Sequence, residues 1–230
     1  MAEREIFTTI RFKYSFESGI GEYDQERYVK TVNVEIVGEN DVDGEFHIGT
    51  AKRYVLLLGQ AINEDYSIED VFDISGEICD FEDIYDFENY DFQEDLEEQF
   101  GIDNSDLCIY SRAEILPKYR GYGLGKMLMK DSFNMLGPGC GLIVMKPYPL
   151  QFECRRDSEE DKEYVKRMGF DNMEHDMSKA FKGFKAYCKS IGFMTSKNYP
   201  DFMFLSTSQR NPKMDEIDLN DDTSVRGLRK

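Results

Sequence analysis

A glycine-rich turn carries the clearest chemical signal in the sequence. The segment from Leu116 to Met129 reads LPKYRGYGLGKMLM, and in it Gly121, Gly123 and Gly125 alternate with larger residues. Glycines at this spacing let backbone N–H groups approach a ligand with no Cβ atom in the way. A helix that begins here would aim its unpaired N–H groups and the positive end of its dipole at the same point. The segment therefore predicts a binding site for phosphate or diphosphate.

Two cationic side chains, Arg120 and Lys126, flank this turn in a chain that is otherwise strongly negative. The spacing does not match the Walker motif, because Met127 stands where that motif needs a hydroxyl. It does not match the dinucleotide fingerprint G-x-G-x-x-G either, and the strand before it follows an antiparallel group of strands. We therefore expect a phosphate-containing ligand of another class.

The elements that must position the turn follow from hydrophobic periodicity. Strands are expected at about 6–16, 27–37, 45–58, 107–116, 141–145 and 201–206, and helices at about 68–85, 92–101, 121–136, 158–168 and 178–191. The first three strands read as an antiparallel meander. The strand, helix and strand that follow form a βαβ unit, whose two strands are parallel. The fold class is therefore α/β (α+β).

A single domain is expected over residues 1–206, with an acidic helical insertion at about 64–104 and a polar, flexible tail over 207–230. The formal net charge is −18, from 46 Asp and Glu against 28 Lys and Arg, and the residues from Glu64 to Asp106 carry the whole imbalance. Such a chain is repelled by nucleic acid, so no nucleic-acid partner is expected. Two interpretations of the acidic segment stay open: a solvated helical face, or an acidic wall beside a site for a cationic substrate.

The composition also bears on membrane association, secretion and metal binding. The longest apolar runs fall far short of the roughly 20 residues that span a bilayer, so no membrane partner is expected. The N-terminal residues lack the pattern of a signal peptide. Five scattered cysteines and only two histidines predict no metal site. Reduced thiols of this kind indicate a cytoplasmic protein.

The sequence R-x-x-G-x-G, formed by Arg120, Gly123 and Gly125 after a strand that ends at Pro117, resembles the acetyl-coenzyme A loop of the GNAT superfamily of N-acetyltransferases. The resemblance implies a mixed, mostly antiparallel sheet with a central splayed parallel strand pair and flanking helices. It also implies acetyl-CoA as acyl donor. The acetyl group would pass by direct attack to a primary amine of a small molecule or peptide.

In element order the resemblance covers roughly residues 6–206, and the local match is confined to about 114–150 and 186–193. It implies that the diphosphate sits on the backbone amides of Arg120, Gly121, Tyr122, Gly123, Leu124, Gly125 and Lys126. The pantetheine arm would pair with Ile115 and Leu116 and lie where that strand and the next splay apart.

The resemblance also suggests catalytic residues. Tyr187 is the expected acid for the leaving thiolate and Glu114 the expected base. Many family members place the tyrosine at the position that Cys188 holds here, one residue later. Packing of Tyr187 in the core and a surface position for Glu114 are the alternatives. Tyr164 is a weaker candidate acid, and Lys146 is a candidate ligand contact.

One departure concerns topology. The family usually has two helices between its first two strands, but residues 17–26 are too few for two helices. The acidic helices could take their place and bring their acids to the acceptor side, which would suit a cationic acceptor. The alternative function is a non-catalytic GNAT-like acidic interaction module, either a coenzyme A binder or a nucleic-acid mimic. The acceptor and the oligomeric state, a homodimer included, stay open.

Overall fold

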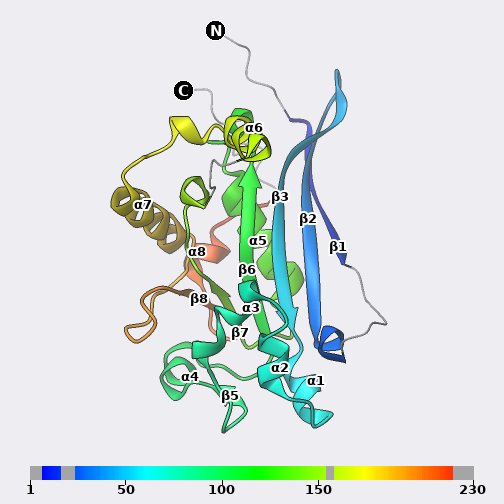
Figure 1. The fold of residues 1–230 in the computed structure, drawn as a ribbon. Helices are drawn as coiled ribbons and strands as arrows, with labels where there is room; N and C mark the ends of the chain where they lie inside the picture. The colour runs from blue at the N-terminus through cyan, green and yellow to red at the C-terminus, as the bar shows by residue number, and fades with distance from the viewer. Residues whose placement is uncertain (1–6, 17–23, 154–157, 220–230) are drawn as a thin grey trace.

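The computed structural model describes residues 7–16, 24–153 and 158–219. A mixed sheet in the order β1-β2-β3-β6-β7-β8 forms its centre (Figure 1). These strands are β1 (Thr9–Phe16), β2 (Val29–Asn40), β3 (Gly44–Leu56), β6 (Leu107–Ile115), β7 (Leu142–Met145) and β8 (Met203–Ser206). Neighbouring strands are antiparallel except β6 and β7, which are parallel. The mixed α/β class, the meander and the parallel pair are thus confirmed.

Helices and short turns connect these strands. The helices are α1 (Leu58–Asn63), α2 (Ile68–Phe72), α3 (Gly76–Cys79), α4 (Glu94–Phe100), α5 (Leu124–Leu136), α6 (Glu159–Met168), α7 (Met177–Ser190) and α8 (Pro212–Asp215). The 3-10 turns are η1 (Asp24–Tyr28), η2 (Glu82–Ile84), η3 (Pro117–Tyr119), η4 (Leu150–Phe152) and η5 (Phe170–Asn172). A two-stranded ribbon pairs β4 (Tyr85–Asp86) with β5 (Asp91–Phe92). No helix in the described ranges is long and apolar enough to cross a bilayer.

The back face of the sheet is the one on which α5 and α7 pack. Val32 and Val34 of β2 are buried there against Leu128 of α5. Cys188 of α7 is buried in a neighbouring cluster with Cys108 of β6. The alternation of β2 leaves its intervening polar residues exposed on the opposite, front face, as expected for an antiparallel sheet with one covered side.

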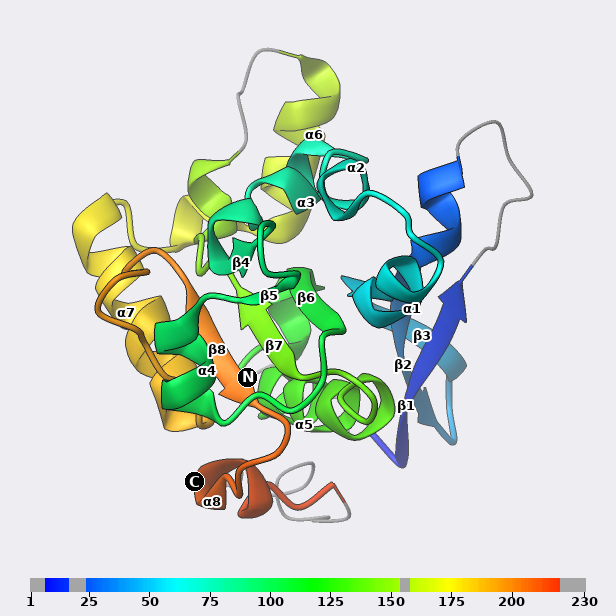
Figure 2. The same ribbon diagram turned by 90° about the horizontal axis from the view of Figure 1, so that it is seen from below.

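The acidic insertion (residues 64–104) covers part of the front face. Its apolar residues share one buried cluster with Leu107 and Ile109 of β6 and with Val144 of β7. Because neighbouring residues of a strand point to opposite faces, these side chains lie opposite the back-face residue Cys108. Figure 2 shows α2 and α3 on one side of the sheet and α5 on the other. The insertion and α5 therefore cover opposite faces of the sheet.

The insertion is not the long helix expected over 68–85. Helix α2 ends at Phe72, α3 spans only Gly76–Cys79, and η2 and β4 follow. Ser75 has extended backbone angles and separates α2 from α3. Gly76 follows it, and glycine is a poor residue for continuing a helix. The apolar residues that suggested one helix are still buried in the front cluster, but from separate turns. The shorter helix expected over 92–101 begins at Glu94.

Two further expectations need correction. The third strand was expected to run to residue 58, but it ends at Leu56 and α1 begins at Leu58. The first part of the expected flexible tail, residues 207–219, is docked instead. The Thr207 hydroxyl donates to the Cys140 carbonyl at 2.6 Å, and α8 buries Met214 completely in the back-face core. Residues 220–230 of the expected tail lie outside the described ranges.

Candidate functional site

The parallel strands β6 and β7 diverge after a short paired stretch. Their pairing ends at Ile109 and Val144. Strand β6 continues to Ile115, with β3 beside it along its whole length, whereas β7 stops at Met145. We call this divergence the fork. Residues 110–115 of β6 therefore have no strand neighbour on the β7 side.

The backbone groups of β6 that face the fork follow from one hydrogen bond. The Leu116 N–H donates to the Ile48 carbonyl of β3 at 2.9 Å. Since backbone groups along a strand point alternately to its two sides, those of Ile115 and Ala113 point away from β3, toward the fork. The Ile115 carbonyl already accepts a hydrogen bond from Nε of Arg120 at 2.8 Å. Of the two residues expected to contact the pantetheine arm, Ile115 therefore directs its N–H at the fork. Leu116 does not, because its N–H donates to β3.

The glycine turn lies between the end of β6 and the start of α5. Gly121 and Gly123 have φ values of 82° and 77°, a left-handed conformation that favours glycine. A Cβ atom on either glycine would have no atom within 4 Å, so both face open space. Within the described residues, no backbone N–H from Gly121 to Gly125 donates a hydrogen bond. Five consecutive free N–H groups at the positive end of a 13-residue helix are an arrangement of donors that suits an anion.

Of the two cationic side chains beside the turn, Arg120 is engaged by other parts of the described chain and Lys126 is not. The Arg120 guanidinium ties the turn to its neighbours, because Nε donates to the Ile115 carbonyl and Nη2 donates to the Met168 carbonyl, both at 2.8 Å. Burial lowers the pKa of Arg120. Lys126, in the first turn of α5, is exposed and forms no ion pair within the described ranges. The charge free to meet an anion is therefore that of Lys126.

Tyr187 projects from α7 onto the same turn. A Cβ atom on Gly125 would lie 2.5 Å from the Tyr187 hydroxyl oxygen, and the Ile115 side chain lies beside it. Burial raises the pKa of Tyr187 to about 12. Its hydroxyl has no hydrogen-bond partner among the described residues. The expected acid thus lies at the glycine turn, on the back face.

Glu114 lies on the front face, in a network that also contains Tyr164. Its Oε1 accepts from Nε of Arg112 at 2.5 Å and from the Tyr164 hydroxyl at 2.8 Å. Arg112 also donates to Glu153 at 2.5 Å and to Tyr164 at 2.8 Å. Burial raises the pKa of Tyr164 to about 12. The expected acid and base are therefore not brought together but lie on opposite faces, with the fork between them.

A residue that the sequence did not single out lies where the strands part. Glu77 of α3 accepts from the Ser111 hydroxyl and the Tyr54 hydroxyl, both at 2.9 Å, and from Nζ of Lys52 at 3.2 Å. Burial alone would raise its pKa, but these three donors outweigh burial and lower it. Glu77 is one of many acids in the insertion, so the sequence offers no signal that distinguishes it.

Lys146, the first residue after β7, forms an ion pair with Asp80 at 3.2 Å. Asp80 follows α3 directly, so α3 and its C-cap contact β6 through Ser111 and the exit of β7 through Lys146. The acidic insertion thus bridges both strands at the start of the fork. The two acids of these contacts, Glu77 and Asp80, are each paired with a cationic side chain, Lys52 and Lys146 respectively.

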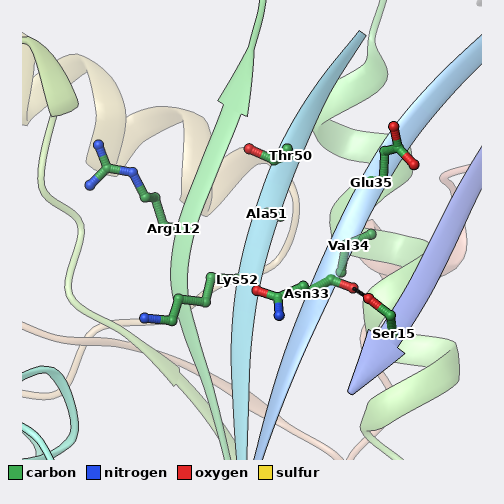
Figure 3. A pocket seen from close by; sticks show the side chains of 8 residues that line it. All are labelled: Ser15, Asn33, Val34, Glu35, Thr50, Ala51, Lys52 and Arg112. Atoms are coloured by element: carbon green, nitrogen blue, oxygen red, sulfur yellow. Dashed lines mark hydrogen bonds between the residues drawn. The ribbon is translucent and has the colours of Figure 1, made fainter. Parts of the chain in front are cut away.

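A hollow of about 310 Å³ lies on the open part of the front face, over the strands from β1 to β6. Its lining residues come from four neighbouring strands: Ser15, Asn33, Val34, Glu35, Thr50, Ala51, Lys52 and Arg112. Figure 3 shows the side chain of Lys52 reaching across β6 and that of Arg112 extending beyond β6 on the same side, whereas Val34 and Ala51 belong to the back-face core. Hydroxyl, amide and charged side chains line the hollow, and one of them, Lys52, donates to Glu77.

Among the described residues, no group of three or more His, Cys, Asp or Glu side chains is arranged to hold a metal ion. The chain matches no protein-family model, no curated protein and no solved structure. A functional assignment therefore rests on the geometry of the site.

Proposed function

We propose that the protein is a GNAT-type N-acetyltransferase that moves an acetyl group from acetyl-CoA to a primary amine. The observation that carries this proposal is the row of free N–H groups from Gly121 to Gly125 beside a fork in a parallel strand pair. A diphosphate supplies acceptors for such a row of donors. The free edge of β6 supplies backbone groups for the amides of an extended arm, in the manner of an added strand.

The dimensions of the site fit this ligand. The pantetheine chain between diphosphate and sulfur is about as long as four residues of extended strand, roughly 13 Å. An arm that starts beside Ile115, at the glycine turn, and runs along β6 brings its sulfur to Ser111 and Tyr110. The pairing with β7 ends one residue before Tyr110. The thioester would therefore lie where the fork begins.

The acceptor amine would approach from the front face. Glu77 is a carboxylate at that point, because it accepts from Ser111 itself, whereas Glu114 lies three residues further along β6. The lowered pKa of Glu77 keeps it ionised at neutral pH, so it can accept a hydrogen bond from the neutral amine and take the proton that the nitrogen releases as the N–C bond forms. As the new N–C bond forms, the C–S bond breaks and the electron pair leaves with sulfur.

The side chains that line the hollow indicate what kind of acceptor it would bind. Asn33, Thr50 and Ser15 offer neutral hydrogen-bonding groups, and Lys52 and Arg112 contribute positive charge. We propose a small polar amine, or the amine end of a peptide, as acceptor. A strongly cationic acceptor would have to replace the Lys52–Glu77 and Lys146–Asp80 ion pairs.

An amine panel tests the proposal. Purified protein is mixed with acetyl-CoA and with amino acids, amino sugars, polyamines, aminoglycosides or peptides, and free thiol is followed. We expect amine-dependent thiol release from the wild type, none from Gly123→Glu, and at least a hundredfold slower release from Glu77→Gln. Glu98→Gln, at an exposed position in the same insertion, should react like the wild type. Folded protein that binds acetyl-CoA but acetylates none of the panel would favour the non-catalytic module.

A further inference from the structure

The charges of the chain are segregated along the sequence. From Glu64 to Asp106 there are 18 Asp and Glu and no Lys or Arg. From Met177 to Lys213 the balance is reversed, with seven Lys and Arg and a single acid, Asp201. We call residues 177–213 the basic segment. The chain therefore carries a strongly acidic and a strongly basic part, although its net charge is −18.

Helix α7 holds most of the positive charge of the basic segment. It contains no acid, and its lysines are Lys179, Lys182, Lys185 and Lys189. The last three follow one another at steps of three and four, so they share one flank of the helix, which we call the lysine flank. Tyr187 is two residues from Lys185 and faces the other way, toward the glycine turn. The lysine flank therefore lies on the side of α7 away from that turn.

Two members of the lysine flank have no carboxylate partner. Lys182 and Lys189 are exposed and form no ion pair within the described residues. Nζ of Lys185 donates to the Pro200 carbonyl at 2.8 Å, which holds the flank beside the loop of residues 194–200. Like charges three and four residues apart on a helix repel each other. An acidic partner would relieve this repulsion.

The loop of residues 194–200 connects the lysine flank to the acidic insertion. Nε2 of Gln99 in α4 donates to the Thr195 carbonyl at 3.1 Å, and Nδ2 of Asn198 donates to Asp95 of α4 at 2.9 Å. Figures 1 and 2 both show α7 and α4 on the side of the molecule opposite β1. The basic and acidic parts are therefore neighbours on one side of the molecule, with this loop between them.

The loop and α4 present an apolar and an acidic group next to the lysines. Met194 is 38% exposed, while its backbone pairs with Phe204 of the edge strand β8. Methionine is enriched in the cores of protein interfaces. Asp91 and Glu94, at the start of α4, are exposed and form no ion pair within the described residues. Along this side of the molecule, lysines, an exposed methionine and carboxylates thus follow one another.

We propose that this side of the molecule binds a second copy of the chain in a two-fold symmetric dimer, with Met194 near the axis. In such a dimer every contact occurs twice, so α7 of each protomer lies on α4 of its partner. Each lysine flank then meets the acids of α4. The dimer does not depend on the proposed function, and it leaves the fork open because Tyr187 is on the other side of α7.

Size and screening are compatible with this dimer. With 14 residues, α7 is about 21 Å long. This is close to the width of a patch of about 800 Å², the area that a stable interface buries on each partner. The net charge of −18 opposes association at long range. At physiological salt, however, charges are screened beyond about 8 Å, so the opposite charges in contact dominate.

The test uses two charge-reversed variants and sedimentation velocity. Lys182→Glu/Lys189→Glu places glutamates against the partner's carboxylates, and Asp91→Lys/Glu94→Lys places lysines against the partner's lysines. The wild type should dimerise between about 1 and about 100 μM protein, a range that includes weak affinities for an interface of this size. Each variant alone should dimerise at least a hundredfold more weakly. Their equimolar mixture should form heterodimers, because both contacts then join opposite charges.

A matched control separates local contacts from net charge. Lys166→Glu/Arg167→Glu makes the same change in net charge at exposed positions of α6, and it should dimerise like the wild type. A monomeric wild type, a Lys182→Glu/Lys189→Glu variant that dimerises normally, or a mixture that stays monomeric would each overturn the dimer. Species larger than a dimer would contradict the two-fold symmetry. A monomeric wild type that binds heparin through the lysine flank would assign this surface to an acidic polymer instead.

Discussion

The Tyr187 hydroxyl lies where a side chain on Gly125 would have to go, 2.5 Å from the position of a Cβ atom. This contact joins α7 to the first turn of α5 and explains why the third residue of the glycine series has no side chain. The next ring atom of Tyr187 lies 3.6 Å from the same point, which is an ordinary contact distance. The conflict with a larger residue therefore comes from the hydroxyl oxygen alone.

A double-mutant cycle follows from this contact. Alanine is better than glycine in a helix by about 1 kcal/mol, but in Gly125→Ala the displaced Tyr187 hydroxyl should cancel that gain. In the Tyr187→Phe background the gain should reappear, with a coupling free energy of about 1 kcal/mol between the two substitutions. Urea denaturation of the four proteins measures it.

Gly183→Ala is the matched control for that cycle. Gly183 lies within α7 and has no atom within 4 Å of a Cβ position, so the alanine should stabilise the protein equally with Tyr187 or Phe at position 187. Equal effects of Gly125→Ala in the two backgrounds would show that the hydroxyl does not occupy this place.

Glu77 gives the protein a pH-dependent contribution to stability. Its folded-state pKa is lowered below the ordinary 4.5, because the hydrogen bonds from Ser111, Tyr54 and Lys52 outweigh the opposing effect of burial. The stabilisation is therefore present above pH 4.5 and is lost as the pH falls through the lowered folded-state pKa. We expect Glu77→Gln to have a lower thermal midpoint than the wild type at pH 7, and the difference to shrink in acid.

Glu98→Gln provides the comparison for Glu77→Gln, since Glu98 is exposed in the same insertion. Its thermal midpoint should follow the wild type at every pH. A Glu77→Gln variant whose deficit persists unchanged well below pH 4.5 would mean that the carboxylate charge does not stabilise the native state.

Helix α8 makes residues 212–215 part of the core. Met214 is fully buried among back-face residues, so Met214→Ala should reduce the free energy of unfolding by about 2–5 kcal/mol. Met135 of α5 is 60% exposed, and Met135→Ala should cost much less. Equal, small effects of the two substitutions would show that residues 212–215 are not packed in the core.

Local signals in the sequence account for most of the fold. The alternation of β2, the turn at Gly123 and the apolar run of β7 each have one structural interpretation, and the parallel pair follows from the connection between β6 and β7. The insertion was harder to predict, because apolar spacing of three and four residues fits one long helix as well as several short turns on a common core. Only tertiary packing decides between them.

Of the candidate site, the glycine turn was predicted from the sequence, whereas Glu77 was not. The anion-binding turn depends on backbone conformation, which its glycines reveal. The position of Glu77 depends on a contact with Ser111, 34 residues away, and such a contact leaves no trace in local sequence. Tyr187 was predicted from its place near the end of a helix, and its hydroxyl contacts Gly125 in the glycine turn.

Calorimetric titration with acetyl-CoA tests the central claim, that the turn at Gly123 binds the diphosphate. Gly139 is the matched control: its φ of 93° is also left-handed, a Cβ there also meets no atom within 4 Å, and it lies beyond the opposite end of α5. We predict saturable binding to the wild type and to Gly139→Glu and none to Gly123→Glu. Equal binding to all three proteins, or no binding to the folded wild type, would contradict this account.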